Sequence, residues 1–156
     1  MFVEKNDFYR TLVAQAHALI ADEPDMIANM ANISALLFNE MPDLNWSGFY
    51  ILRDDVLVLG PFQGKPACVR IPVGKGVCGT AVQTGEIQLV EDVHQFEGHI
   101  ACDAASNSEI VLPIRVNQQI IAVLDIDSPS LARFDAADRD GLQQLVAVLE
   151  KRLEHA

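Results

Sequence analysis

The chain has 156 residues, of which 50% are hydrophobic and 21% are charged, and this balance is typical of a folded globular protein. Eleven Lys and Arg residues face 22 Asp and Glu residues, which gives a formal net charge of -11. Nucleic acid and anionic membrane surfaces are therefore not expected as partners, because both repel a polyanion. The length predicts a single domain over residues 1–156.

The N-terminal residues and the number of cysteines predict the cellular location of the protein. The sequence Met1-Phe-Val-Glu-Lys-Asn-Asp turns polar at once and lacks the features of a signal peptide, and the apolar runs are too short to span a membrane. Three cysteines without a secretory signal predict a reducing, cytoplasmic location. The odd number excludes a fully paired disulfide framework.

Two helices are expected before residue 41, separated by a break at residues 22–25. Apolar side chains recur at helical spacing on both sides of this break, as expected for faces that pack into a core. They are Phe8, Leu12, Ala16 and Leu19 in the first helix, and Met26, Met30, Ile33 and Leu37 in the second.

The pattern then changes to that of strands. Residues 46–53 and 56–59 predict a hairpin with its turn at Asp54-Asp55, and a third short strand is expected around residues 67–71. A glycine-rich turn at 72–76 leads into a helix, and a short strand follows at 87–90. The Gly74-Lys-Gly-Val-Cys-Gly segment matches neither common phosphate-binding spacing, so it is interpreted as a turn.

The last third predicts a long loop, a second hairpin and a closing helix. Residues 91–108 show little periodicity, and loops of this length are usually functional or mobile. Residues 109–116 and 120–126 form the hairpin across a turn at Asn117-Gln118, with the second strand apolar enough to be central. Asp135 is expected to cap a helix with an apolar face made by Leu142, Leu145, Leu149 and Leu153. The fold class is α+β, an antiparallel sheet with helices packed on one face and loops over the other.

Cys102 is the candidate reactive residue. It lies in a polar segment where burial alone explains little, whereas Cys68 and Cys78 fit buried positions in a strand and at a helix start. A zinc site is the alternative for His94, His99 and Cys102, with Cys68 or Cys78 as a fourth ligand, but the spacing of these residues does not match the usual patterns. Neither a metal nor another cofactor is expected.

Asp125 and Asp127 form a second candidate cluster. Alternation along a strand puts both carboxylates on one face, where they repel each other unless they are solvated or matched to a cation. They indicate either a strand end that reaches solvent or a pocket wall that receives an ammonium group.

Five segments together resemble the free methionine-(R)-sulfoxide reductases, which are stand-alone GAF domains. The segments run in order from Trp46 to Ser128. They are Trp46-Ser-Gly-Phe-Tyr, Gly60-Pro-Phe-Gln-Gly-Lys-Pro-Ala-Cys, Gly76-Val-Cys-Gly, Asp92-Val-His-Gln-Phe-Glu-Gly-His-Ile-Ala-Cys-Asp and Leu124-Asp-Ile-Asp-Ser.

The resemblance implies the roles of individual residues. Cys102 is the catalytic cysteine, Cys68 the resolving cysteine, and Cys78 a third cysteine that substitutes or assists. The substrate pocket is lined by Trp46, Tyr50, Glu109, Asp125 and Asp127. The resemblance further implies free methionine-(R)-sulfoxide as substrate, an intramolecular disulfide recycled by thioredoxin, and a homodimer.

The chemistry of these residues agrees with such a reaction. A cysteine thiolate attacks the sulfoxide sulfur and becomes a sulfenic acid, which condenses with a second thiol. Glu109 is the candidate proton donor if burial and the two aspartates raise its pKa. Acidic neighbours such as Asp103 disfavour the Cys102 thiolate, and the substrate ammonium, His99 or backbone amides are the candidate activators.

Two other functions fit the same sequence. One is a GAF sensor that binds a small ligand without catalysis, and the other is a redox switch that signals through a Cys68 to Cys102 disulfide. Turnover of the separated epimers of methionine sulfoxide distinguishes the three.

Overall fold

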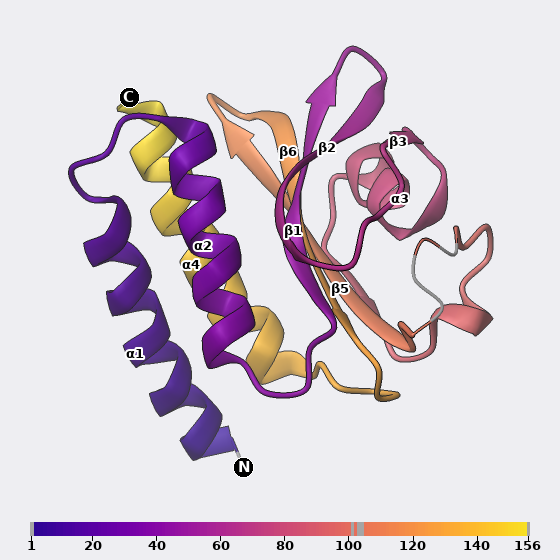
Figure 1. Cartoon of the computed structure of the whole chain (residues 1–156), viewed down its shortest axis with the longest axis horizontal. Helices are drawn as coiled ribbons and strands as arrows, with labels where there is room; N and C mark the ends of the chain where they lie inside the picture. Colours follow the sequence, from indigo (N-terminus) through magenta and orange to yellow (C-terminus); the bar gives the residue numbers. More distant parts are fainter. Residues whose placement is uncertain (1, 101, 103–104, 156) are drawn as a thin grey trace.

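The computed structural model describes residues 2–100, 102 and 105–155, with side chains from residue 4 onward. Figure 1 shows the helices and strands of the chain. In order, they are α1 (Phe2–Ile20), α2 (Met26–Glu40), β1 (Trp46–Arg53), β2 (Val56–Gly64), β3 (Arg70–Pro72), α3 (Gly76–Thr84), β4 (Gln88–Val90), the short 3-10 helix η1 (Val93–Gln95), β5 (Ser108–Val116), β6 (Gln119–Ser128) and α4 (Ala136–Glu154).

The described strands form an antiparallel sheet in the order β3-β2-β1-β6-β5-β4. Both predicted hairpins are present, and β6 is central as expected, between β1 and β5. The turn from β5 to β6 has Asn117 and Gln118 at φ 53° and 68°, the left-handed pair that matches the twist of a two-residue hairpin.

The third strand lies later in the chain than predicted. It was expected around residues 67–71 but spans Arg70–Pro72. Residues 66–68 leave the ladder, where the Cys68 carbonyl accepts a hydrogen bond of 2.8 Å from the Tyr50 hydroxyl. The apolar residues of this segment therefore cover the sheet instead of extending it.

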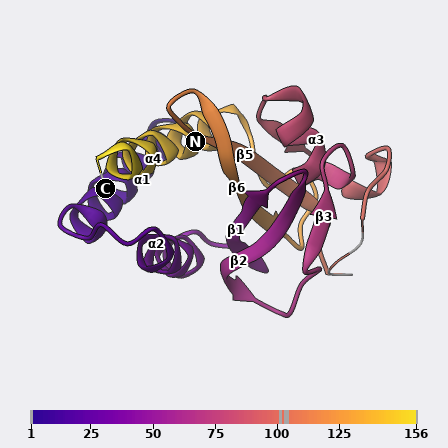
Figure 2. The ribbon, with the colours of Figure 1, turned by 90° about the horizontal axis from the view of Figure 1, so that it is seen from above.

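Each face of the sheet has its own apolar core. One core packs α1, α2 and α4 against the side chains of Phe49, Ile110, Leu124 and Ile126. The other packs α3 and the loops against Tyr50, Val111 and Val123. Figure 2 shows α1, α2 and α4 on one side of the sheet and α3 on the other, so the face expected to carry loops carries a helix as well.

Both N-terminal helices are confirmed, with one error in the predicted core face. Leu19 is 44% exposed, whereas Tyr9 and Ile20 are buried. The reason is that α1 packs mainly on α4 and not directly on the sheet, so its buried face is set by a neighbouring helix. Within the described residues, no helix has both the length and the apolar character needed to cross a membrane.

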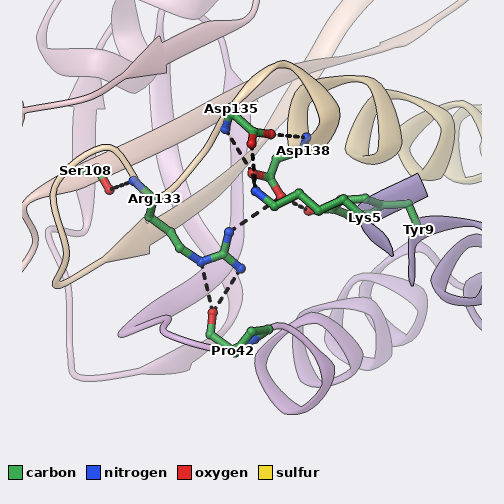
Figure 3. A network of polar contacts seen from close by, with 7 residues as sticks. All are labelled: Lys5, Tyr9, Pro42, Ser108, Arg133, Asp135 and Asp138. Carbon is green, nitrogen blue, oxygen red and sulfur yellow. Dashed lines mark hydrogen bonds and ion pairs between the residues drawn. The ribbon is translucent and has the colours of Figure 1, made fainter. Parts of the chain in front are cut away.

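A polar network joins α1, α4 and the segment before α4 (Figure 3). Asp138, 1% exposed, accepts hydrogen bonds of 2.7 Å from both the Tyr9 hydroxyl and Lys5 Nζ. Asp135 caps α4 as predicted and forms a capping box with Asp138. The backbone N–H of Arg133 donates to Ser108 Oγ, which connects this network to the first residue of β5.

Candidate active site

A small cavity of about 40 Å³ lies over the sheet face that α3 covers. Its walls come from β1, β5, β6, the start of α3 and the loops around residues 67 and 100. They are formed by Trp46, Tyr50, Ala67, Ile71, Gly76, Val77, Cys78, His99, Ile100, Cys102, Ser106, Glu109, Asp125 and Asp127. The cavity thus contains every residue proposed from the sequence for catalysis or substrate binding except Cys68, which is bonded to Cys102.

Strand register brings the three carboxyl groups together. Asp127 of β6 lies opposite Glu109 of β5 on one side and Trp46 of β1 on the other. Asp125 is two residues away on the same face, while Ile126 points into the opposite core. All three carboxyl groups are buried, at most 9% exposed, so the alternative that the aspartates mark a strand end in solvent is wrong.

Burial changes the protonation of these carboxyl groups. The pKa of Glu109 is raised well above its usual value, first by desolvation and then by the charges of Asp125 and Asp127. The pKa of Asp125 is raised by desolvation, against which hydrogen bonds from Glu109 and Cys78 act. Burial and the neighbouring charges therefore favour the protonated form of Glu109, which is the form that a proton donor needs.

Hydrogen bonding in this cluster is incomplete among the described residues. Among the residues that the structure describes, Asp125 Oδ1 is buried and has no hydrogen-bonding partner. A buried acceptor without a partner costs about 1–3 kcal/mol, and native structures contain few of them. A donor supplied by a ligand relieves this cost.

An aromatic wall stands beside the carboxyl groups. The Trp46 ring stacks on Phe62 at 5.1 Å and on Tyr50 at 5.9 Å between centroids, and its indole N–H donates to the Lys65 carbonyl. Gly48 lies between Trp46 and Tyr50 on the same face, where a Cβ atom would approach Phe62 Cβ to 2.3 Å. Glycine at this position lets β1 and β2 come close enough for the rings to stack.

The three cysteines differ in state. Cys68 and Cys102 form a disulfide with Cα atoms 5.4 Å apart, which connects the segment after β2 to the loop before β5. Both are half-buried. Cys78 is free, 3% exposed and located in the first turn of α3, and burial followed by the charge of Asp125 raises the pKa of its thiol well above the usual value.

The candidate activators of the Cys102 thiolate include His99 and the backbone amides at the start of α3. Asp103 lies outside the described residues. Desolvation and the nearby His94 lower the pKa of His99, so the imidazolium form is disfavoured at neutral pH. Gly76, Val77 and Cys78 bring the N-terminal turn of α3 to the cavity, and its N-cap Lys75 offers no side-chain acceptor to the first amides. This favours the backbone amides over His99 as the local source of positive potential.

Several wall residues were not identified from the sequence. Ile100, Ser106 and Val77 line the cavity, yet their own segments show no periodicity that indicates it. Ser106 is held by a hydrogen bond from the side chain of Asn45, 61 positions away. The sequence signal for this part of the wall is the glycine at position 76, a residue type that readily adopts positive φ. Its φ is 61°, and Ile100 lies 3.3 Å from the position that a Cβ would occupy.

This sheet, with three helices on one face and a small cavity under α3 and loops on the other, is the architecture of a GAF domain. The family model described as GAF domain matches residues 28–153. The free methionine-R-sulfoxide reductase of Escherichia coli (strain K12) is 62% identical over 151 residues, which cover 97% of this chain and 92% of the relative.

Solved structures give the same result. fRMsr of Staphylococcus aureus in complex with substrate is 56% identical with a TM-score of 0.90, covering 93% of this chain and 95% of that chain. Free methionine-R-sulfoxide reductase from Neisseria meningitidis in complex with its substrate is 45% identical with a TM-score of 0.93, covering 96% and 90%. The chain belongs to the free methionine-R-sulfoxide reductase family and is an oxidoreductase.

Proposed function

We propose that the chain reduces free methionine-(R)-sulfoxide to methionine, with Cys102 as the catalytic cysteine. One observation carries the proposal: three buried carboxyl groups share a cavity with Cys102, whose sulfur is bonded to Cys68. Such a cavity combines a redox-active thiol pair with a receptor for a small cation. The relatives that were solved with substrate support the choice of substrate.

The head of a free amino acid fits the charges around the cavity. Its ammonium group supplies donors for Asp125 and Asp127, including the Oδ1 atom that has no partner among the described residues. Its carboxylate faces the N-terminus of α3, where the amides carry partial positive charge. Trp46 presents an apolar ring to the thioether methyl group.

The reaction proceeds in three balanced steps. The Cys102 thiolate attacks the sulfoxide sulfur, the proton of Glu109 goes to the oxygen, and the oxygen ends on Cys102 as a sulfenic acid while methionine leaves. The Cys68 thiol then condenses with the sulfenic acid, which forms the disulfide and releases water. A dithiol reduces the disulfide by exchange, and we propose thioredoxin in the cytoplasm as this reductant.

Two further properties belong to this proposal. We propose that residues 1–156 act as one domain and that the chain works as a homodimer, as the resemblance implies. Cys78 is assigned no step in the first two reactions and serves as an alternative resolving thiol only when Cys68 is absent.

The separated R and S epimers of free methionine sulfoxide test the proposal. Incubation with the protein and a dithiol is expected to yield methionine from the R epimer, with Cys102→Ser as the inactive control. Binding of the R epimer without methionine formation supports a sensor instead. Oxidation to the disulfide by peroxide, again without methionine formation, supports a redox switch.

A further inference from the structure

Cys78 is a buried nucleophilic group that the proposed reaction does not use. Its Sγ atom, one oxygen of Glu109 and one oxygen of Asp125 all lie within 4.8 Å of one another. Asp125 Oδ1 is buried and has no hydrogen-bonding partner within the described part of the chain. One thiol and two carboxyl groups therefore converge, and one of these carboxyl groups, that of Asp125, carries the unsatisfied acceptor.

This donor set has the composition of a site for a thiophilic divalent cation. Mg²⁺ and Ca²⁺ prefer oxygen ligands alone, whereas Zn²⁺ takes sulfur and carboxylate oxygen together. We propose that Cys78, Glu109 and Asp125 bind one Zn²⁺ ion, with the open side of the cavity supplying a water as the fourth ligand. The ion acts as an inhibitor of this pocket and not as a resident cofactor.

The geometry needs only a small adjustment. Zinc bonds of about 2.0–2.3 Å place neighbouring ligands of a tetrahedral site roughly 3.5 Å apart. The three atoms are within 4.8 Å of one another, so a contraction on the order of 1 Å is enough. Rotation of the three side chains, on α3, β5 and β6, is the movement that this contraction requires.

The charges also balance in favour of binding. The ion displaces the proton of the Cys78 thiol and the proton held by Glu109, and both leave to solvent. The product places three anionic ligands around a 2+ ion at a buried site. A coordinating thiol is deprotonated outright by zinc.

The bound ion occupies the position proposed for the substrate ammonium. This consequence for catalysis rests on the proposed function, whereas the binding itself does not. A direct binding experiment therefore remains decisive even if the chain has another substrate.

The disulfide form of the full chain gives the sharpest test. The chain has three cysteines, and with Cys68 and Cys102 bonded, Cys78 is the remaining thiol. Titration with Co²⁺, in buffer without added thiol, is expected to give a thiolate-to-cobalt charge-transfer band that saturates at one ion per chain. Zn²⁺ should then abolish the band, and Mg²⁺ in excess should not.

Variants identify the ligands. Cys78→Ser is expected to remove the band, and Asp125→Asn or Glu109→Gln to weaken Zn²⁺ binding, measured by calorimetry, by roughly 100-fold, because even partners outside the coordination shell contribute about 10- to 100-fold. Asp54→Asn is the matched control, since it removes an exposed carboxylate at a φ of 58° that asparagine also tolerates. Circular dichroism checks that each variant is folded.

Three results overturn the proposal. They are the absence of a charge-transfer band at millimolar Co²⁺, a band that persists in folded Cys78→Ser, and Zn²⁺ affinity that is unchanged in either folded carboxyl variant. If Cys78→Ser does not fold, the two carboxyl variants decide, since both must lose affinity while Asp54→Asn keeps it.

Discussion

Cys68 and Cys102 are separated by 34 residues in sequence and are joined by a disulfide, and Cys102 lines the same cavity as three buried carboxyl groups. The bond connects two segments outside the sheet ladder, one after β2 and one before β5. Thiol exchange at this position can therefore proceed without breaking strand pairing. This relationship makes the roles of the two cysteines separable by mutation.

Cys102→Ser is expected to abolish reduction of free methionine-(R)-sulfoxide. Serine is a far weaker nucleophile at neutral pH and cannot form a sulfenic acid. Methionine formation is the measurement, with Cys78→Ser as a comparison at another cavity cysteine. Near wild-type turnover by Cys102→Ser would contradict the assignment of the nucleophile.

Cys68→Ser is expected to convert about one substrate per site and then to cycle poorly with thioredoxin. The first chemical step needs only Cys102, whereas regeneration needs a resolving thiol. A quenched single-turnover assay beside a steady-state assay separates the two steps. Rapid cycling would shift the resolving role to Cys78, and a missing burst would show that Cys68 takes part in reduction itself.

N-acetyl-methionine-(R)-sulfoxide is expected to be a very poor substrate. The neutral amide leaves the buried carboxylates of Asp125 and Asp127 unpaired, and loss of one partner from a desolvated charge pair costs about 2–5 kcal/mol. The ratio kcat/KM should thus fall roughly 30-fold or more. Asp125→Asn should discriminate less between the two compounds, and equal efficiencies for wild type would mean that these carboxylates do not read the ammonium.

Glu109→Gln is expected to lower kcat by about 10²- to 10⁴-fold, the usual contribution of general acid catalysis. Burial raises the pKa of Glu109 and so favours its protonated form, and kcat in the wild type is expected to fall as pH rises through that pKa. Kinetics across pH should show this alkaline decrease in wild type and not in the variant. A decrease that persists in Glu109→Gln assigns the titration to another group.

Glu109→Gln lowers kcat but is expected to raise stability relative to the wild type as the pH rises. Because the folded pKa of Glu109 lies above the unfolded value, the folded state binds more protons between the two, and wild-type stability falls as pH rises through this window. Glutamine does not titrate, so Glu109→Gln should gain in Tm over wild type at pH 7 relative to pH 4. An unchanged difference between the two pH values would mean that Glu109 ionises normally in the folded chain.

Asp138→Ala is expected to destabilise the chain by about 3–5 kcal/mol, because the buried Tyr9 hydroxyl and Lys5 lose their shared acceptor. Tyr9→Phe removes one hydrogen bond to a charged group and should cost about 1.5–3 kcal/mol. Urea unfolding of both variants measures the difference. Equal losses would show that Lys5 and the capping box gain nothing from Asp138.

Local sequence patterns were sufficient for most secondary structure. The turn residues Asn117 and Gln118, the cap at Asp135 and the break at 22–25 were all located, because such positions depend on backbone conformation and on nearby hydrogen bonds. The predicted position of β3 was wrong. Its pairing competes with contacts between the Cys68 segment and Tyr50, which lie 18 residues apart.

The sequence by itself determined the fold class, the shared face of Asp125 and Asp127, and the cysteines available for redox chemistry, since alternation and residue type are local properties. Tertiary structure alone decided that Glu109 lies opposite Asp127 and that Cys78 meets Asp125. It also decided that Leu19 is exposed while Tyr9 is buried. These outcomes depend on strand register and helix packing between distant segments, and the low dielectric that raises the pKa of Glu109 exists only once those segments exclude water.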